Sequence, residues 1–261
     1  MKIGTYAWMQ QSHGRLSFKE KLTLIHQSML PTLRSSLAML LHPQQTACVV
    51  DFDQIVLPDS AIIRHAIEVL EEQQDLCLLH HSWRSYYWAA ALAQISAQSF
   101  DVETLVCAAL YHDIGLLKLQ GNCEPQHCQC FTYASADYFE QHAERLSFDG
   151  DKTATVKDAI CMHMNGFLDR SEAAEVQLLQ LGTACDVVGQ NYFKLAVQYR
   201  QQVHSSFPRQ DFSQKFSKLL HDEAQQRPHA RVALLRKLGL AQMIKLNPLD
   251  REVESARSRE G

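Results

Sequence analysis

Apolar residues recur at spacings of three and four along most of the chain, the spacing that places side chains on one face of an α-helix. Glycine and proline rarely interrupt this pattern, with 10 and 7 copies respectively in 261 residues. The best candidate for a strand is the β-branched segment 47–58, which could equally form an extended arm. The sequence therefore predicts an all-α fold, with helices at residues 18–30, 32–41, 59–74, 81–98, 101–113, 132–145, 152–164, 172–189, 190–203, 209–225 and 229–243.

The composition, with 46% apolar and 21% charged residues, is that of an ordinary soluble globular protein. A net charge of −4 provides no concentrated positive field, so we expect neither nucleic acid nor a membrane as a partner, and instead a small-molecule substrate. The N-terminus has no apolar segment typical of a signal peptide, which predicts a cytoplasmic protein. The charged segment 221–237 could form a contact between copies in a homo-oligomer.

The eight cysteines are expected to be reduced, because the chain is long and no export signal is recognisable. Cys107, Cys161 and Cys185 lie within apolar helical patterns and are predicted to be small buried hydrophobic residues. A loop of reduced thiols is the favoured interpretation of segment 121–130, and a second zinc site is the alternative, because the spacing matches no common structural zinc motif. The residues that crowd into this segment are Cys123, His127, Cys128 and Cys130.

Four predicted helices carry polar residues on their apolar faces. The apolar face of 101–113, continued by three or four residues, reaches His112 and Asp113, and the same spacing places His81, His163 and Asp186 on inward faces. A buried carboxylate without compensation costs several kcal/mol, and a divalent metal would offset that cost. Imidazoles combined with carboxylates suit zinc, iron, manganese, cobalt or nickel, and we take zinc as the first candidate for a single ion. Inward histidines that only pack and hydrogen bond are the alternative.

The polar residues occur in the segments "HSWRSYYWAAALA", "AALYHDIGL" and "EVQLLQLGTACDVVG". In this order the segments resemble the HD-domain superfamily of metal-dependent hydrolases, and residues 55–248 are similar to its cyanamide hydratase-like branch. The resemblance implies an all-helical HD bundle at 55–248, with an N-terminal helical extension at 1–54 and a frayed tail at 249–261. It also implies the metal ligands His81, His112, Asp113 and Asp186.

The resemblance implies a reaction in which water activated by the metal adds to a small polar molecule, with cyanamide-like nitriles as the leading substrate class. His163 is the candidate proton donor, although a purely packing role is equally compatible with the sequence. The second candidate is a phosphohydrolase acting on nucleotides or phosphomonoesters, in which Arg84 and Lys118 would hold the phosphate. Arg84 could equally form a salt bridge, and Lys118 could be a solvated loop charge.

Two further alternatives use the same residues differently. A dinuclear HD oxygenase would recruit His142 and His163 as ligands of a second ion, although the charged surroundings of His142 indicate a surface position. A non-catalytic protein would keep the metal or bind a ligand and act through a partner. The presence of all four expected ligands favours an enzyme.

Overall fold

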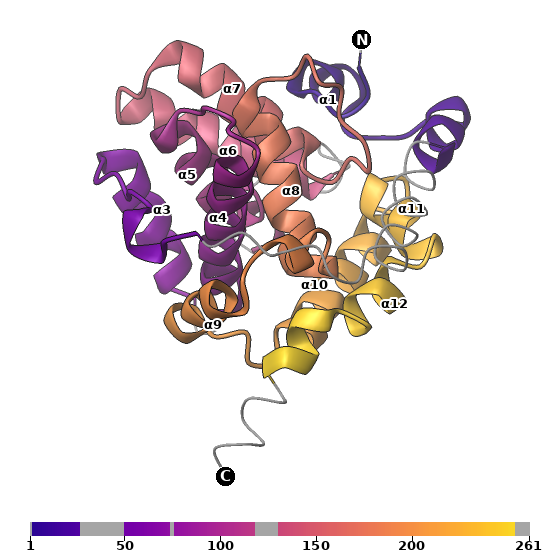
Figure 1. Ribbon diagram of the computed structural model, residues 1–261. Helices are drawn as coiled ribbons and strands as arrows, with labels where there is room; N and C mark the ends of the chain where they lie inside the picture. The colour runs from indigo at the N-terminus through magenta and orange to yellow at the C-terminus, as the bar shows by residue number, and fades with distance from the viewer. Residues whose placement is uncertain (1, 27–49, 74–75, 118–129, 254–261) are drawn as a thin grey trace.

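The computed structural model of the protein describes residues 2–26, 50–73, 76–117 and 130–253. Within these ranges the regular elements are all helical, as the sequence predicts, and no residue lies in a strand (Figure 1). The described part of the strand candidate, residues 50–58, is irregular apart from the short 3-10 turn η1 (Phe52–Gln54). The strand prediction is therefore wrong for these residues, and the alternative of a non-strand arm agrees with the structure. The predicted helix at 32–41 lies outside the described residues.

The helices follow one another in a simple order. A first helix, α1 (Tyr6–Ser12), packs on α6 and α7, and residues 18–26 form another helix. The remaining labelled α-helices are α3 (Ala61–Glu71), α4 (Cys77–Ile95), α5 (Val102–Tyr111), α6 (Phe131–Arg145), α7 (Gly150–Met162), α8 (Ala174–Val188), α9 (Val197–Ser206), α10 (Phe212–Gln226), α11 (Arg231–Lys237) and α12 (Leu240–Lys245). Residues 248–253 are helical as well. Two further 3-10 turns are η2 (Ile114–Leu116) and η3 (Tyr192–Lys194).

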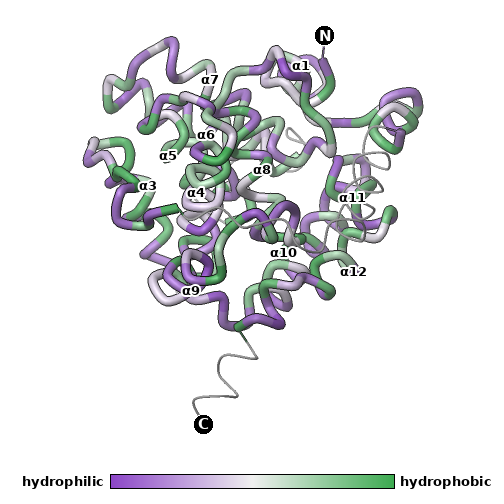
Figure 2. The backbone as a smooth tube through the Cα atoms, in the orientation of Figure 1, coloured by the Kyte–Doolittle hydropathy of each residue, from purple (hydrophilic) through white to green (hydrophobic). Residues whose placement is uncertain are grey.

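The centre of the molecule is the contact between α4 and α8 (Figure 1). Gly182 on α8 makes this contact close, because a Cβ there would lie 2.1 Å from the backbone oxygen of Ser85 on α4. Residues 89–91 of α4 are alanines, whose small side chains are buried. Helices α5, α6 and α7 cover one side of the pair, and α10, α11 and α12 lie on the other. Figure 2 shows hydrophobic and hydrophilic residues alternating along α10–α12, as expected of helices with one face on the core.

Gly115 suits a left-handed helix C-cap in the sequence, but the structure does not use it in that way. Helix α5 ends with His112 in a right-handed conformation (φ −59°, ψ −31°), and Gly115 lies in η2 without a positive φ. A Cβ at Gly115 would lie 2.1 Å from the backbone oxygen of Phe131. The glycine is therefore required by the close approach of η2 to α6, not by backbone conformation.

The C-terminal third differs from the predicted boundaries in three places. The helix expected at 190–203 begins only at Val197, as α9, and the turn η3 precedes it. The helix expected at 229–243 is divided into α11 and α12 by Gly239, which has φ +97°. The frayed tail expected from residue 249 is wrong at its start, because Leu249 is fully buried and Glu252 forms an ion pair with Arg200. Residues 254–261 lie outside the described part.

Cysteine burial follows the prediction where the structure describes it. Cys107, Cys161 and Cys185 are fully buried, and Cys130 is buried as well. Cys123, His127 and Cys128 lie outside the described residues. None of the described helices combines the length and hydropathy that a membrane span requires.

Candidate metal centre and its cavity

Four polar side chains meet at the ends of three helices. His81 comes from the start of α4, His112 and Asp113 directly follow α5, and His163 directly follows α7. All four are buried, with at most 8% of each residue exposed. Because helix ends direct these residues toward one point, positions up to 82 residues apart in the chain become neighbours.

The three imidazoles are each fixed through Nδ1. The Nδ1 of His112 lies 2.6 Å from the backbone oxygen of Ala109, and that of His163 lies 2.8 Å from the backbone oxygen of Ile160. The Nδ1 of His81 lies 2.8 Å from Oδ2 of Asp186. Carbonyl and carboxylate oxygens only accept, so each Nδ1 carries a proton and donates it. When these imidazoles are neutral, the Nε2 atom of each ring therefore carries an unshared electron pair.

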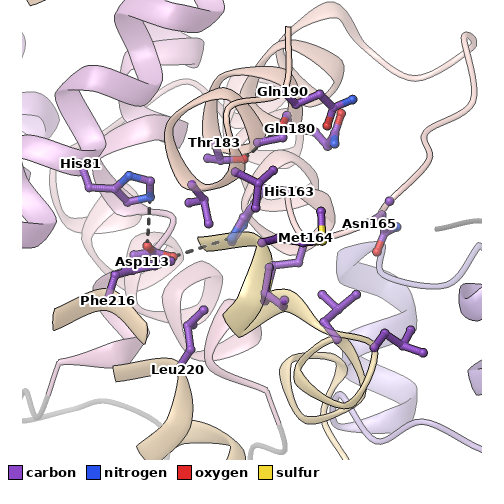
Figure 3. A pocket seen from close by; sticks show the side chains of 18 of the residues that line it. His81, Asp113, His163, Met164, Asn165, Gln180, Thr183, Gln190, Phe216 and Leu220 are labelled. Atoms are coloured by element: carbon purple, nitrogen blue, oxygen red, sulfur yellow. Dashed lines mark hydrogen bonds and ion pairs between the residues drawn. The ribbon is translucent and has the colours of Figure 1, made fainter. Parts of the chain in front are cut away.

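These Nε2 atoms surround the carboxylate of Asp113. The Nε2 atoms of His112 and His81 lie 3.2 Å and 3.4 Å from Oδ2, and that of His163 lies 3.7 Å from Oδ1 (Figure 3). Neither oxygen of Asp113 accepts a hydrogen bond from any described residue, although both are buried. The Nε2 atoms of His81 and His112 are only 3.2 Å apart. Acceptor atoms therefore face one another without a proton donor between them.

The electrostatics of the group follow from this crowding. Burial opposes ionisation of Asp113, but His112 and the other two imidazoles outweigh it and lower the pKa of Asp113 to about 2. Burial lowers the pKa of His163 to about 3, and the nearby His112 adds to the effect. Burial also lowers the pKa of His81, whereas the carboxylate of Asp113 outweighs burial and raises the pKa of His112. The site thus holds a buried negative charge with at least two neutral imidazoles at neutral pH.

The donor set fits a divalent transition metal. Ligand atoms from His81, His112 and Asp113 lie within 4.8 Å of one another. Two imidazole nitrogens and one carboxylate oxygen are a ligand combination that zinc and its neighbours accept, with positions left for other ligands. A cation at this point would offset the burial of Asp113 and separate the facing lone pairs of the imidazoles.

Asp186 is placed differently from the expected ligand role. Its Oδ2 accepts from His81 Nδ1, on the side of the ring away from Asp113, and from Arg84 Nη2. Its Oδ1 accepts from Arg84 Nε, Trp88 Nε1 and Arg209 Nη1, at 2.8, 2.9 and 2.9 Å. Five hydrogen bonds occupy the carboxylate, so the structure does not bring Asp186 into the cluster of His81, His112 and Asp113.

Arg84 also differs from its expected position at a phosphate. The guanidinium is fully buried, and its remaining Nη1 donates to the backbone oxygens of Phe207 and Pro208. Every nitrogen of Arg84 is therefore engaged with Asp186 or with backbone, and the residue does not line the cavity described below. The structure thus does not bring Arg84 to the cavity wall. Lys118 lies outside the described residues.

His142 lies away from the centre. It is half-buried on α6, its ring stacks on His65 with centroids 4.2 Å apart, and its Nδ1 lies 2.8 Å from the backbone oxygen of Tyr138. His142 does not line the cavity that contains Asp113 and His163. The structure therefore does not bring the two histidines of the dinuclear alternative together.

A cavity of about 370 Å³ opens from the metal end. His81, Asp113 and His163 form part of its wall, and the uncharged polar side chains Asn165, Gln180, Thr183 and Gln190 form another part (Figure 3). The rest is apolar and comes mainly from α8, α10, α11 and α12. Among the described residues, no lysine or arginine lines this cavity.

Sequence reasoning missed the uncharged polar residues of this wall. Gln180 precedes Thr183 by three residues, and Val187 follows Thr183 by four, so the three share one helical face. That spacing was the available signal on α8. Asn165 follows the end of α7 and hydrogen bonds to Arg231, a contact 66 residues away for which the sequence offers no signal.

Part of the chain that forms this site is similar to a known family of protein domains. Residues 78–186, from the first turn of α4 to the end of α8, match the model of the HD domain. The match supports the HD superfamily. Members of that superfamily are generally metal-dependent hydrolases, and the HD domain is an all-α fold, in agreement with the helices seen here. No curated protein matches the chain.

Proposed function

We propose that the protein is a metal-dependent hydratase or hydrolase of the HD superfamily, acting on a small uncharged molecule, with cyanamide-like nitriles as the first substrate class to test. The observation that carries the proposal is the convergence of acceptor atoms at one end of a cavity. Three imidazole Nε2 atoms and the buried carboxylate of Asp113 meet there, and no described residue donates a hydrogen bond to that carboxylate. The HD match over residues 78–186 supports a metal-dependent hydrolase as the general class.

In this proposal His81, His112 and Asp113 hold one divalent ion, with zinc as the first candidate and iron, manganese, cobalt or nickel as the others. Such an ion supplies Lewis acidity, which lowers the pKa of a bound water toward neutrality and polarises a substrate. Asp186 orients His81, because it accepts a hydrogen bond from Nδ1–H and so leaves Nε2 free to bind the metal.

His163 is the proposed proton carrier. Its Nδ1 is committed to the backbone oxygen of Ile160, so its Nε2 presents a lone pair at the wall of the cavity. Hydration of a nitrile to an amide forms a carbon–oxygen bond and moves both protons of the attacking water to the nitrogen, the first to give the imidic acid and the second as that acid rearranges to the amide. Nε2 would accept a proton from oxygen and pass it at once to nitrogen in each transfer, since burial lowers the pKa of His163, so the imidazole begins and ends neutral. His163 would thus act first as a proton acceptor and then as the proton donor that the sequence predicts.

The absence of a described cation at the cavity wall favours a neutral substrate over a phosphate ester. Arg84 is committed to Asp186 and to backbone oxygens. Stabilising a transferring phosphoryl group normally requires cationic groups or additional metal ions. The phosphohydrolase prediction therefore has less support from the geometry than the hydratase prediction.

The test combines metal content with product analysis. Elemental mass spectrometry should find about one divalent ion per wild-type chain and none above background in Asp113→Ala. Asp53→Ala is the matched control, because Asp53 is exposed on η1 and should leave the metal in place. Release of urea from cyanamide by the wild type alone would support the hydratase. Release of phosphate from a nucleotide panel, without urea, would replace it by the phosphohydrolase.

A further inference from the structure

The cavity is much larger than the metal chemistry requires. Its volume of about 370 Å³ exceeds twice the roughly 150 Å³ of an apolar protein cavity that binds benzene. Cyanamide has only three non-hydrogen atoms and would occupy the metal end alone. The wall of the remaining space includes residues of α11 and α12.

The cavity wall combines ionisable and apolar residues. His81, Asp113 and His163 form the metal end, where the rings of Phe216 and Phe131 contact His81 and His163. A further part of the wall, here called the apolar end, consists of leucines, valines and a methionine: Val187, Val188, Leu235, Leu238, Leu240 and Met243. A ligand that reaches the metal and also covers these residues must carry both a polar group and an apolar body.

The apolar end comes from outside the HD match. That match ends at residue 186, whereas all six of these apolar residues follow it in the chain. Leu238 is 40% exposed and Met243 is 37% exposed, although both are large apolar residues at the wall of a cavity. Covering such exposed apolar surface is favourable, at about 25 cal/mol per Å². A bound ligand with an apolar body would cover it.

We propose that the substrate is an uncharged amphiphile, in which an apolar body of several carbon atoms is attached to the reacting nitrile-type group. The body lies against α11 and α12, and the polar group lies at Asp113 and His163. This inference rests on the proposed function for the reacting group, but the apolar end stands on its own lining. Because no described lysine or arginine lines the cavity, an anionic head group would find no cationic side chain among the described lining residues and could be paired only with the proposed metal ion, which favours a neutral substrate.

The test measures binding along a homologous series of neutral probes. N-alkylureas, from methylurea to hexylurea, keep a constant polar head and add one methylene at a time. Isothermal titration calorimetry on the zinc-loaded wild type should show Kd falling about fourfold per methylene, which corresponds to about 0.8 kcal/mol per buried CH₂. A Kd that does not depend on chain length, or no binding by any member, would overturn the inference.

The same series on Asp113→Ala separates this inference from the proposed function. The dependence on chain length should persist in Asp113→Ala, because the apolar residues of α11 and α12 remain. If the wild type holds metal and hydrates cyanamide but shows no dependence on chain length, the apolar-body inference fails and the proposed function stands. If the dependence is present but no metal binds, the proposed function fails and the apolar site stands.

Two leucines provide a matched pair of variants for locating the binding site. Leu238 and Leu246 are the C-cap residues of α11 and α12, and both are exposed, at 40% and 50%, but only Leu238 lines the cavity. Leu238→Glu should weaken hexylurea binding at least tenfold and reduce the dependence on chain length. Leu246→Glu should bind as the wild type does. Met243→Glu serves as a second cavity variant, and equal effects of cavity and control variants would overturn the proposal.

Discussion

The Nδ1 of His81 lies 2.8 Å from Oδ2 of Asp186, while the Nε2 of the same ring faces Asp113 at 3.4 Å. This contact joins α4 to α8, the two helices at the centre of the fold. Burial opposes ionisation of Asp186, but Arg84 and Arg209 outweigh it and hold its pKa well below the ordinary range. The carboxylate thus stays charged and keeps the proton of His81 on Nδ1, which leaves Nε2 free for a metal.

Asp186→Asn should weaken metal binding without abolishing it. A partner that only orients a ligand typically changes metal affinity by about 10- to 100-fold when it is mutated. The variant should also be less stable, by about 3 kcal/mol or more, because Arg84 loses the carboxylate that compensates its burial. Zinc titration against a competing chelator and urea denaturation measure the two effects.

Asp250→Asn is the control for this prediction. Asp250 also pairs with Arg209, at 2.7 Å, but it does not contact His81. It should therefore leave the affinity for zinc unchanged. Complete loss of metal in Asp186→Asn, with Asp250→Asn normal, would instead show that Asp186 is itself a ligand.

Removal of metal should lower the melting temperature of the wild type. A ligand that binds only the folded state stabilises it by RT ln(1 + [L]/Kd), or about 2.7 kcal/mol at a hundredfold excess over Kd. Treatment with a chelator should therefore lower the Tm of the wild type and leave that of Asp113→Ala unchanged. Differential scanning fluorimetry with and without the chelator checks this, and equal shifts in both proteins would contradict binding at Asp113.

Much of the candidate site could be predicted from the spacing of residues within single helices. His112 and Asp113 continue the apolar face of α5, and His81 and His163 lie on the inward faces of α4 and α7. The placement of Asp186 could not be predicted in this way. Its inward direction follows from helical spacing, but its hydrogen bond to Arg209 depends on where the chain after α9 returns to α8.

The fold shows the same division between local and distant causes. The helices α5 and α7 lie within two residues of their predicted ranges, and each begins at a local cap, where the side chains of Asp101 and Asp149 accept hydrogen bonds from the backbone N–H of Thr104 and Lys152. The predicted C-cap role of Gly115 is wrong, because the atom that requires a glycine at this position, the backbone oxygen of Phe131, belongs to another helix. Local propensity therefore predicts that these helices exist, and tertiary contacts decide which residues they require.

His204 should make the protein sensitive to acid. It is half-buried beside Trp88, its buried Nε2 has no hydrogen-bond partner among the described residues, and desolvation followed by repulsion from Arg209 lowers its pKa to about 3. The unfolded chain takes up this proton near pH 6.5, whereas the folded protein does not, so stability falls as pH decreases below about 6.5. The loss amounts to about 1.4 kcal/mol per pH unit until the pH approaches 3.

His204→Leu should remove that component. Urea denaturation at pH 7 and pH 5 should show a difference between the two pH values that is about 2 kcal/mol smaller in the variant than in the wild type. His163 contributes in the same direction and remains in the variant, so some dependence on pH persists. His13→Leu is the control, since His13 is exposed at the end of α1 and should leave the difference unchanged.

Gly182→Ala should disturb the contact between α4 and α8 and, through it, the metal centre. The added Cβ would lie 2.1 Å from the backbone oxygen of Ser85, and backbone cannot move aside as a flexible side chain can. Overpacking of this kind costs about 1–3 kcal/mol or more, and relief requires the two helices to separate. Separation would lengthen the contact between His81 and Asp186, so both Tm and zinc affinity should fall.

Gly150→Ala is the control, because a Cβ at Gly150 meets nothing within 4 Å. A lower Tm with unchanged zinc affinity would mean that the metal centre does not depend on the spacing of α4 and α8.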